Sequence, residues 1–323
     1  MTARHKLLVS LGALGLVVLV WRIDLNAVQL ALFHVGWGMA LVLSQEIVAH
    51  VLNASGWRFA FTREVAARFS LRELVRLRVA GDAINYLTPT ATIGGEVART
   101  AMLSDACGAD VRAVSVIIAK ATQTLAQAFF ITAGLALVAT EWITTGPLRS
   151  FLRWAVGVSF LTALLVAHRV KARGSGTAAA WRRAFGTRLG EFLRNHPGRV
   201  ALSTLLFALA YAWGAFEAYW ICRFLLMPVP VVTAFTIEVL SITVDGILFI
   251  VPAKIGTQEG GKVAVFAALG LSPSLGFAFG VVRHVRELIW AALGVYFYGA
   301  AIGRGNLSFW HRARGSTSTP TTL

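Results

Sequence analysis

Long apolar blocks separated by arginine-rich segments are the feature of this sequence that most restricts its fold. A helix needs about 20 mostly apolar residues to cross the hydrocarbon core of a bilayer, somewhat fewer or more when it is tilted. The predicted spans are residues 7–21, 27–52, 113–139, 150–167, 200–222, 231–251, 263–282 and 286–302. The sequence therefore predicts an all-α, polytopic membrane helical bundle of about eight spans.

Composition excludes an ordinary soluble domain. Of the 323 residues, 57% are hydrophobic and 14% are charged, whereas a typical soluble domain has about 25% charged residues. The net charge of +15 comes from basic residues that cluster between apolar blocks, which is the pattern of the positive-inside rule. No long basic, polar domain is present to read a nucleic-acid groove. We therefore expect residues 1–303 to form a single integral membrane domain that does not bind nucleic acid.

The distribution of basic residues predicts the orientation in the membrane. Six arginines lie in residues 53–78 and eight Lys or Arg in residues 168–199, whereas residues 140–148 contain neither. We expect the two basic segments to face the cytoplasm of a bacterial inner membrane. Both termini then lie inside, the first apolar block is a retained span, and residues 304–323, rich in Ser, Thr and Gly, form a disordered cytoplasmic tail.

A triplet of Asp, Pro and Glu occurs twice, with the same spacing between its members. The two copies are Asp82, Pro89 and Glu96, and Asp245, Pro252 and Glu259. Glycines precede each Glu, as Gly94 and Gly95 in the first copy and Gly256 in the second. Pro and Gly interrupt a helix, so each copy predicts a broken membrane segment, which either crosses the bilayer or re-enters on the same side.

The position of the two copies predicts an inverted repeat. Three predicted spans separate them, and an odd number of crossings brings the second copy in from the opposite face. The half-repeats would cover residues 27–139 and 200–302. Paired interrupted segments in two halves are a good sequence pointer to a transporter's central site. The alternative is that both copies are helix-ending turns at the membrane interface.

Polar side chains recur at helical spacing inside the apolar blocks. The four stripes are Glu46, His50 and Asn53; Lys120, Gln123, Thr124 and Gln127; Glu238, Ser241 and Asp245; and Arg283, Arg286, Glu287 and Trp290. Charges in a span rarely face lipid, so the stripes predict a polar interior. They are also compatible with a structural role, in which Arg283 pairs with Glu287 and Lys120 bridges to a nearby carboxylate.

Familiar catalytic motifs are absent from the sequence. Gly256, Gly261 and Lys262 imitate part of a phosphate-binding loop, but Val263 stands where a magnesium-binding Ser or Thr is required. His50 has no second His or Cys at ligand spacing. We expect no cofactor, no metal and no hydrolase activity.

Two segments resemble a known family of membrane domains. They are GDAINYLTPTATIGGEVARTAML and VPAKIGTQEGGKVAVFAALGL. They are similar to the flippase-like membrane domain family, which includes the membrane half of lysylphosphatidylglycerol synthases and, as the nearest likeness, the hopanoid-biosynthesis-associated membrane proteins. The likeness covers about residues 30–302, and its most specific pattern is Pro89, Gly94, Gly95, Glu96 and Arg99. It implies movement or handling of a lipid between leaflets, without the activity of the soluble synthase domain.

The predicted site is a central polar cavity that binds an anionic lipid headgroup. Arg99, Lys120, Arg283 or Arg286 would pair with the headgroup, helped by the amides of the broken helices. Carboxylates would hold these bases, cap the broken helices or carry coupling protons, namely Asp82, Glu96, Asp245 and Glu259. The rival hypotheses are a membrane-embedded lipid-modifying enzyme that uses paired carboxylates, and a noncatalytic scaffold of a lipid-synthesis or export complex.

The predicted orientation can be tested with one cysteine. A cysteine placed at Gly176, in the segment 168–199, should react with a membrane-impermeant maleimide only after the cells are opened. Labelling from the periplasmic side of intact cells would contradict the cytoplasmic assignment of this segment.

Overall fold

The computed structural model of the chain describes residues 25–88, 94–103, 107–142, 190–247, 254 and 256–303. Every regular element in these ranges is helical, which confirms the all-α prediction for the described part of the chain. The predicted spans 7–21 and 150–167, most of the segment 168–199, the tail 304–323, and the prolines Pro89 and Pro252 lie outside the described residues.

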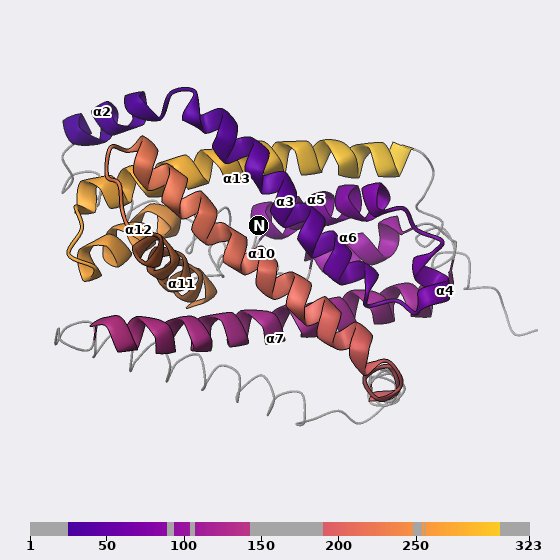
Figure 1. Cartoon of the computed structure of the whole chain (residues 1–323). Coiled ribbons are helices and arrows are strands. Elements are labelled where there is room, and N and C mark those ends of the chain that lie inside the picture. Colours follow the sequence, from indigo (N-terminus) through magenta and orange to yellow (C-terminus); the bar gives the residue numbers. More distant parts are fainter. Residues whose placement is uncertain are drawn as a thin grey trace, which may run out of the picture.

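The described helices pack into an elongated bundle (Figure 1). They are α2 (Leu25–Val35), α3 (Gly38–Arg58), α4 (Arg63–Ala66), α5 (Leu71–Leu87), α6 (Gly94–Met102), α7 (Ala109–Trp142), α10 (Pro197–Phe224), α11 (Val231–Ile247), α12 (Thr257–Ala268) and α13 (Pro273–Gly303).

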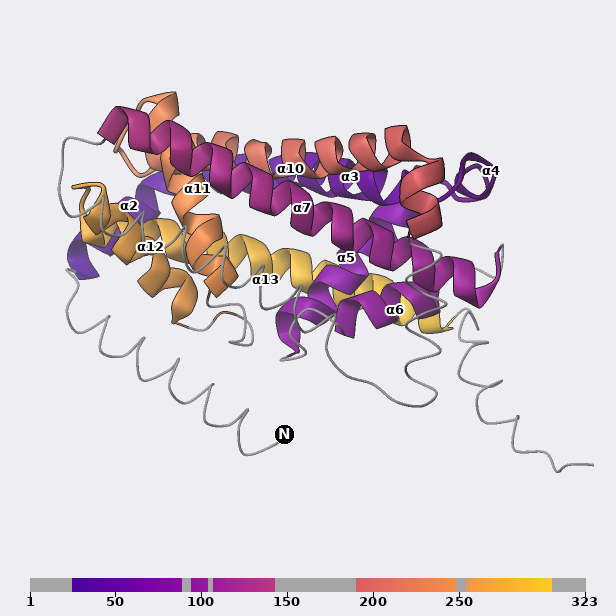
Figure 2. The same cartoon turned by 90° about the horizontal axis from the view of Figure 1, so that it is seen from below.

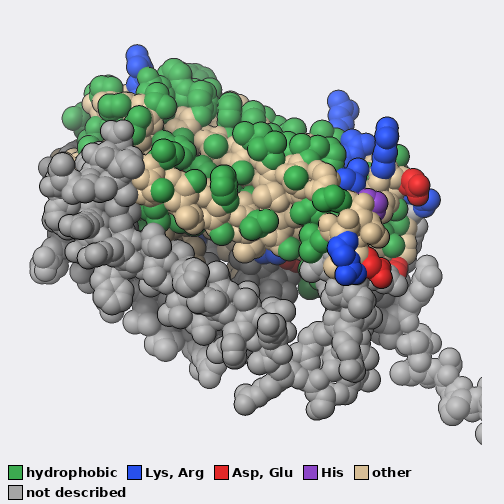
Figure 3. Space-filling view, turned by 60° about the horizontal axis from the view of Figure 1, so that its bottom comes forward, with side chains coloured by type: hydrophobic (Ala, Val, Ile, Leu, Met, Phe, Trp, Pro, Cys, Tyr) green, Lys and Arg blue, Asp and Glu red, His purple; other side chains and the backbone are tan. Residues whose placement is uncertain are grey.

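The length and surface of the helices suit a membrane. Two described segments, Asp110–Leu137 in α7 and Pro197–Phe224 in α10, are long and apolar enough to cross a bilayer, and α2 with α3 qualifies if this pair, bent by 68°, counts as one span. On the face shown in Figure 3, hydrophobic side chains are spread along the bundle, while most of the visible Lys and Arg lie at the end where α4 and the start of α10 are. This distribution is the one expected of helices that face lipid along their length.

Two features of the predicted span pattern are wrong. The predicted spans 263–282 and 286–302 do not exist as separate helices, because α13 runs without a break from Pro273 to Gly303. Arg283 and Arg286 lie within α13 and pair with carboxylates of the bundle, in agreement with the polar interior that their stripe predicted. Arg78 was counted with the exposed basic segment 53–78, whereas it lies on α5 and only 5% of its surface is exposed.

Two groups of four helices share one arrangement. The first group is α3, α5, α6 and α7, and the second is α10, α11, α12 and α13. In each group an interrupted pair, α5 with α6 or α11 with α12, precedes a long last helix. α3 packs along α10 and runs in the opposite direction, and α7 and α13 also run in opposite directions (Figures 1 and 2). α5 packs on α13 and α11 packs on α7, so each interrupted pair contacts the last helix of the other group.

Local interactions explain where the interrupted helices begin. The Ser70 side chain caps α5 by accepting a hydrogen bond from the Glu73 backbone N–H at 3.2 Å, which satisfies a donor that the first turn leaves unpaired. Gly95, in the first turn of α6, donates its N–H to Asn85 Oδ1 at 2.7 Å, which ties α6 back to α5. Gly256 precedes α12 with φ of 73°, a left-handed conformation that glycine adopts without strain. Among the described residues, α5 ends at Leu87 and α6 begins at Gly94, and α11 ends at Ile247 and α12 begins at Thr257, so each predicted interruption has a separate helix on either side.

Close packing of α13 on α5 depends on Gly294. A methyl group at this position would lie 2.5 Å from the Val79 carbonyl oxygen, whereas Gly299 of the same helix has open space around it. We expect Gly294→Ala to lower the free energy of unfolding by about 1–3 kcal/mol, the usual cost of overpacking.

The matched control is Gly299→Ala, which should be neutral or should raise stability by up to about 1 kcal/mol through helix propensity. Thermal unfolding of the purified proteins in detergent would measure both effects. Equal stability of the two variants would contradict the packing seen between α5 and α13.

Candidate functional site

Charged side chains meet inside the bundle in three connected groups. The first cluster joins α5, α6 and α7. Asp82 on α5 accepts hydrogen bonds from Arg78 Nε at 3.0 Å and from Arg99 on α6 at 2.5 Å. Glu96 binds Arg99 at 2.5 Å and lies 3.2 Å from the Lys120 amine on α7. The first cluster therefore ties an interrupted helix pair to the long helix that follows it.

The second cluster likewise joins an interrupted helix pair, α11 with α12, to the long helix that follows it, α13. Asp245 on α11 binds the amines of Lys262 at 2.8 Å and Lys254 at 3.4 Å. The Lys254 amine also forms an ion pair with Glu287 on α13, with 3.0 Å between Nζ and Oε1. Lys254 stands in the interruption before α12 with φ of 51°, a conformation that L-residues adopt uncommonly. The carboxylates on both sides of its amine hold Lys254 in place.

The third cluster connects α3, α10, α11 and α13. Arg283 binds Glu238 and lies 3.2 Å from Glu217. Arg286 binds Glu217 at 2.7 Å and Glu46 at 2.6 Å. Arg283 and Glu217 are almost fully buried. A buried charge is tolerated only when it is paired. Within this cluster the pair of Arg286 and Glu46 links the two helix groups, and the other pairs link helices of the second group.

The sequence repeat extends to a fourth residue in the structure. Arg99 binds Asp82 and Lys262 binds Asp245, and the two bases follow their carboxylates at the same interval along the chain. Both bases are buried, with 3% and 0% of their surfaces exposed. The two copies differ at the Glu, because Glu96 binds Arg99 whereas Glu259 contacts His284 Nδ1 at 2.5 Å.

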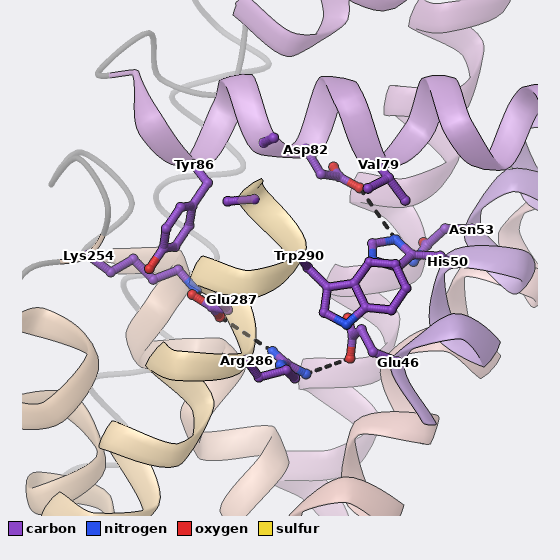
Figure 4. A pocket seen from close by; sticks show the side chains of 12 residues that line it. Glu46, His50, Asn53, Val79, Asp82, Tyr86, Lys254, Arg286, Glu287 and Trp290 are labelled. Atoms are coloured by element: carbon purple, nitrogen blue, oxygen red, sulfur yellow. Dashed lines mark hydrogen bonds and ion pairs between the residues drawn. The ribbon is translucent and has the colours of Figure 1, made fainter. Parts of the chain in front are cut away.

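A pocket of about 210 Å³ lies where the helix groups meet (Figure 4). Residues from α3, α5, α13 and the interruption before α12 line it. They are Glu46, His50, Asn53, Val79, Asp82, Ala83, Tyr86, Lys254, Arg286, Glu287, Trp290 and Ala291. The pocket thus touches the first cluster through Asp82, and the second and third through Glu287, Lys254 and Arg286.

His50 contributes unpaired polar atoms to the pocket. Both of its ring nitrogens are buried without a hydrogen-bond partner among the described residues. The His50 ring contacts the Trp290 ring at a tilt of 51°, with 4.6 Å between centroids, and its Nδ1 lies 3.9 Å from an Asp82 carboxylate oxygen. Buried polar groups normally form hydrogen bonds, so these atoms indicate a site for a ligand that donates and accepts them.

The predicted site residues divide into two sets. Asp82 and Arg286 line the pocket. Six others hold charged partners behind it or beside it, namely Arg99, Lys120, Glu96, Asp245, Glu259 and Arg283. Gly94 begins α6, and Gly95 and Gly256 stand at the starts of the helices as predicted.

The alternative pairings have different outcomes. Lys120 does bridge to a carboxylate, Glu96, as the structural interpretation of its stripe proposed. The proposed pair of Arg283 and Glu287 is wrong, because Glu287 binds Lys254 instead.

Sequence reasoning missed two bases. Lys254, which lies between Pro252 and Gly256, was not singled out from the sequence. A Lys inside an interrupted apolar segment indicates a functional site in a membrane protein. Lys262 was read only as part of a false phosphate loop. Its spacing from Glu259 equals that of Arg99 from Glu96, and this equality could have identified it. Among the described residues, no group of three or more His, Cys, Asp or Glu could hold a metal ion.

The pair formed by Lys262 and Asp245 provides a test of the second cluster. We expect Lys262→Met to lower stability by about 3–5 kcal/mol, because it leaves a buried carboxylate with one partner fewer. The double variant Lys262→Met with Asp245→Asn should recover most of this loss, since Lys254 keeps Glu287 as its partner. Thermal unfolding in detergent measures both. A double variant as unstable as the sum of the single variants would show that the pair is not coupled.

Comparison with known proteins agrees with this architecture. A family model described as the lysylphosphatidylglycerol synthase transmembrane region matches residues 5–294. No curated protein and no solved structure matches the chain. The match covers most of the 323 residues, including both interrupted segments, every cluster residue and the pocket. The chain therefore belongs to the family of the lysylphosphatidylglycerol synthase transmembrane region, and it is an integral membrane protein with a lipid-related role.

Proposed function

We propose that the protein binds the headgroup of a membrane lipid in the central pocket and moves the lipid between leaflets. The observation that carries this proposal is the pocket itself, which both helix groups line and in which both buried ring nitrogens of His50 have no hydrogen-bond partner among the described residues. Such a site inside a bundle with an apolar outer surface suits a ligand with one polar and one apolar part.

The size of the pocket supports a headgroup as its occupant. Its 210 Å³ corresponds to about seven waters at roughly 30 Å³ each. That space accommodates a phosphate with a small polar substituent but no acyl chain. In the proposal the chains stay in the bilayer, against the exposed hydrophobic side chains of the bundle.

The charges of the pocket identify the groups that would contact an anionic headgroup. Lys254 and Arg286 are the cations in the lining, and each also binds Glu287. A phosphate would compete with these carboxylates for the same N–H donors. We therefore assign direct contact to Lys254 and Arg286. Arg99, Lys120 and Arg283 would instead position the carboxylates on which the pocket depends.

The arrangement of the helices supports movement by alternating access. We propose that the two groups form an inverted repeat, with corresponding helices in opposite directions and with the pocket at the repeat interface. Rocking of one group against the other would open the pocket to each leaflet in turn. The movement would be passive or ion-coupled, in an inner membrane with both termini on the cytoplasmic side.

The identity of the lipid is proposed at the level of class. An anionic phospholipid suits Lys254 and Arg286, and a hopanoid is the alternative that the subfamily likeness implies. A lipid-modifying enzyme has less support, because Asp82 and Asp245 are each held by two bases and so are poor candidates for a free acid or base. A scaffold would not need a polar pocket lined by both groups.

The proposal predicts that His50 contributes to transport and not to folding. His50→Phe keeps a flat ring on Trp290 but removes both ring nitrogens. The protein in liposomes should exchange a fluorescent anionic phospholipid between leaflets, and the variant should do so about tenfold or more slowly, the loss expected for one hydrogen bond to a charged group.

The control is His34→Phe, the same substitution on the exposed α2 helix, which should leave exchange unchanged. Covalently altered lipid recovered from the liposomes would instead favour the enzyme. Absence of exchange by the wild-type protein with every lipid tested would contradict the transport proposal.

A further inference from the structure

A second pocket, separate from the central one, differs from it in the charge of its lining. It has a volume of about 580 Å³ and lies at the corner where α3 ends, α4 follows, α5 begins and α10 starts. Its lining contains three arginines, Arg58, Arg63 and Arg199, and no acidic residue, whereas the central pocket has three carboxylates. This corner belongs to the end of the bundle where Lys and Arg gather (Figure 3).

Packing orients one of the three arginines. Arg199, in the first turn of α10, donates from Nε to the Phe61 carbonyl at 2.6 Å and from an Nη atom to the Arg58 carbonyl at 3.1 Å. Its guanidinium also lies over the Phe59 ring, 5.1 Å from the centroid. Carbonyls at the end of a helix attract cations, which explains the position. These contacts use part of the five N–H donors of the guanidinium and supply no negative charge.

The other two arginines have no carboxylate partner among the described residues. Arg58 is half-buried at the end of α3, and Arg63 is exposed at the start of α4. Arg58, Arg63 and Arg199 therefore bring three positive charges around one hollow without compensation from its walls. Like charges repel, and an anion with several acceptor oxygens is the ligand that relieves this repulsion.

The remaining walls define the rest of the ligand. Phe59, Ala66, Ala67 and Leu71 give the pocket an apolar side. A free inorganic anion would not use such a wall, whereas a lipid offers a phosphate to the arginines and the start of its chains to the apolar side. Clusters of Lys and Arg at a membrane surface attract anionic lipids in the same way.

We propose that this corner pocket is a second lipid site, which holds the phosphate of an anionic phospholipid from the leaflet at the basic end of the bundle. The site is separate from the central pocket and does not require that the protein transports lipid. A lipid held there joins the end of α3 to the start of α10, the two helices that lie along each other between the halves.

The test is retention of phosphatidylglycerol by the full chain. The purified protein would be placed in nanodiscs that contain phosphatidylcholine and phosphatidylglycerol. Native mass spectrometry would then release the protein from the nanodisc and count the lipids that stay bound to it. We expect the wild type to keep one phosphatidylglycerol more than the double variant Arg58→Gln with Arg63→Gln. Arg199 is left intact because it also holds α3 to α10.

The matched control is Arg68→Gln with Arg194→Gln, which removes two charges from exposed residues at the same end that do not line the pocket. It should retain phosphatidylglycerol like the wild type. If the first double variant does not fold, Arg63→Gln alone is the second variant. Its affinity for phosphatidylglycerol should fall about tenfold, as expected for one lost charge-assisted contact.

Three outcomes would overturn the proposal. The first is equal retention of phosphatidylglycerol by the wild type and the pocket variants, and the second is a loss of the lipid in the control variant as large as the loss in the pocket variant. The third is displacement of the lipid by millimolar inorganic phosphate, which would show an anion site without lipid recognition. The His50→Phe variant should keep this lipid, so failure of the central site and failure of the corner site give different results.

Discussion

Compensation of charge inside an apolar bundle is the constraint on which the rest of this structure depends. An unpaired charge at the centre of a membrane span costs several kcal/mol, so each buried base must meet a carboxylate. Arg78 binds a carboxylate of its own helix, whereas other buried bases also bind carboxylates of different helices. Arg99 joins α6 to α5, Lys262 joins α12 to α11, and Arg283 and Arg286 join α13 to α10, α11 and α3. The ion pairs therefore define which helices are neighbours.

The same pairs explain why the pocket lies where it does. Interrupted helices leave backbone and charged side chains that lipid cannot satisfy, so they must face protein or a polar cavity. Lys254, in the interruption before α12, lines the central pocket together with residues of α5 and α13. Since α5 belongs to the first helix group and α13 to the second, both groups contribute to the lining. Under the proposed function, a headgroup that takes N–H donors of Lys254 or Arg286 competes with the carboxylates that these bases bind, which would alter the contact between the groups. The corner pocket differs because its arginines have no carboxylate in the lining to replace.

Sequence reasoning found the polar stripes, the two interruptions and most of the charged residues, because these depend on spacing along one helix. It failed where the burial of a charged residue depends on partners that come from other helices. Arg78 was counted with the basic segment 53–78, yet it is buried on α5, and the span boundary placed between residues 282 and 286 falls inside α13. A buried and an exposed arginine look alike in a sequence, since only the carboxylate from another helix makes burial possible.

The sequence by itself determined the all-α membrane class, the repeated Asp, Pro and Glu spacing and the family. These follow from hydrophobic length and local pattern, which one segment of chain contains in full. Only the tertiary structure decided that Asp82 and Arg286 line the pocket while Arg99 and Arg283 support it. The choice among several carboxylates for each base depends on distances between helices that are remote in sequence. Those distances are set by the packing of the whole bundle, including the approach of α13 to α5 at Gly294.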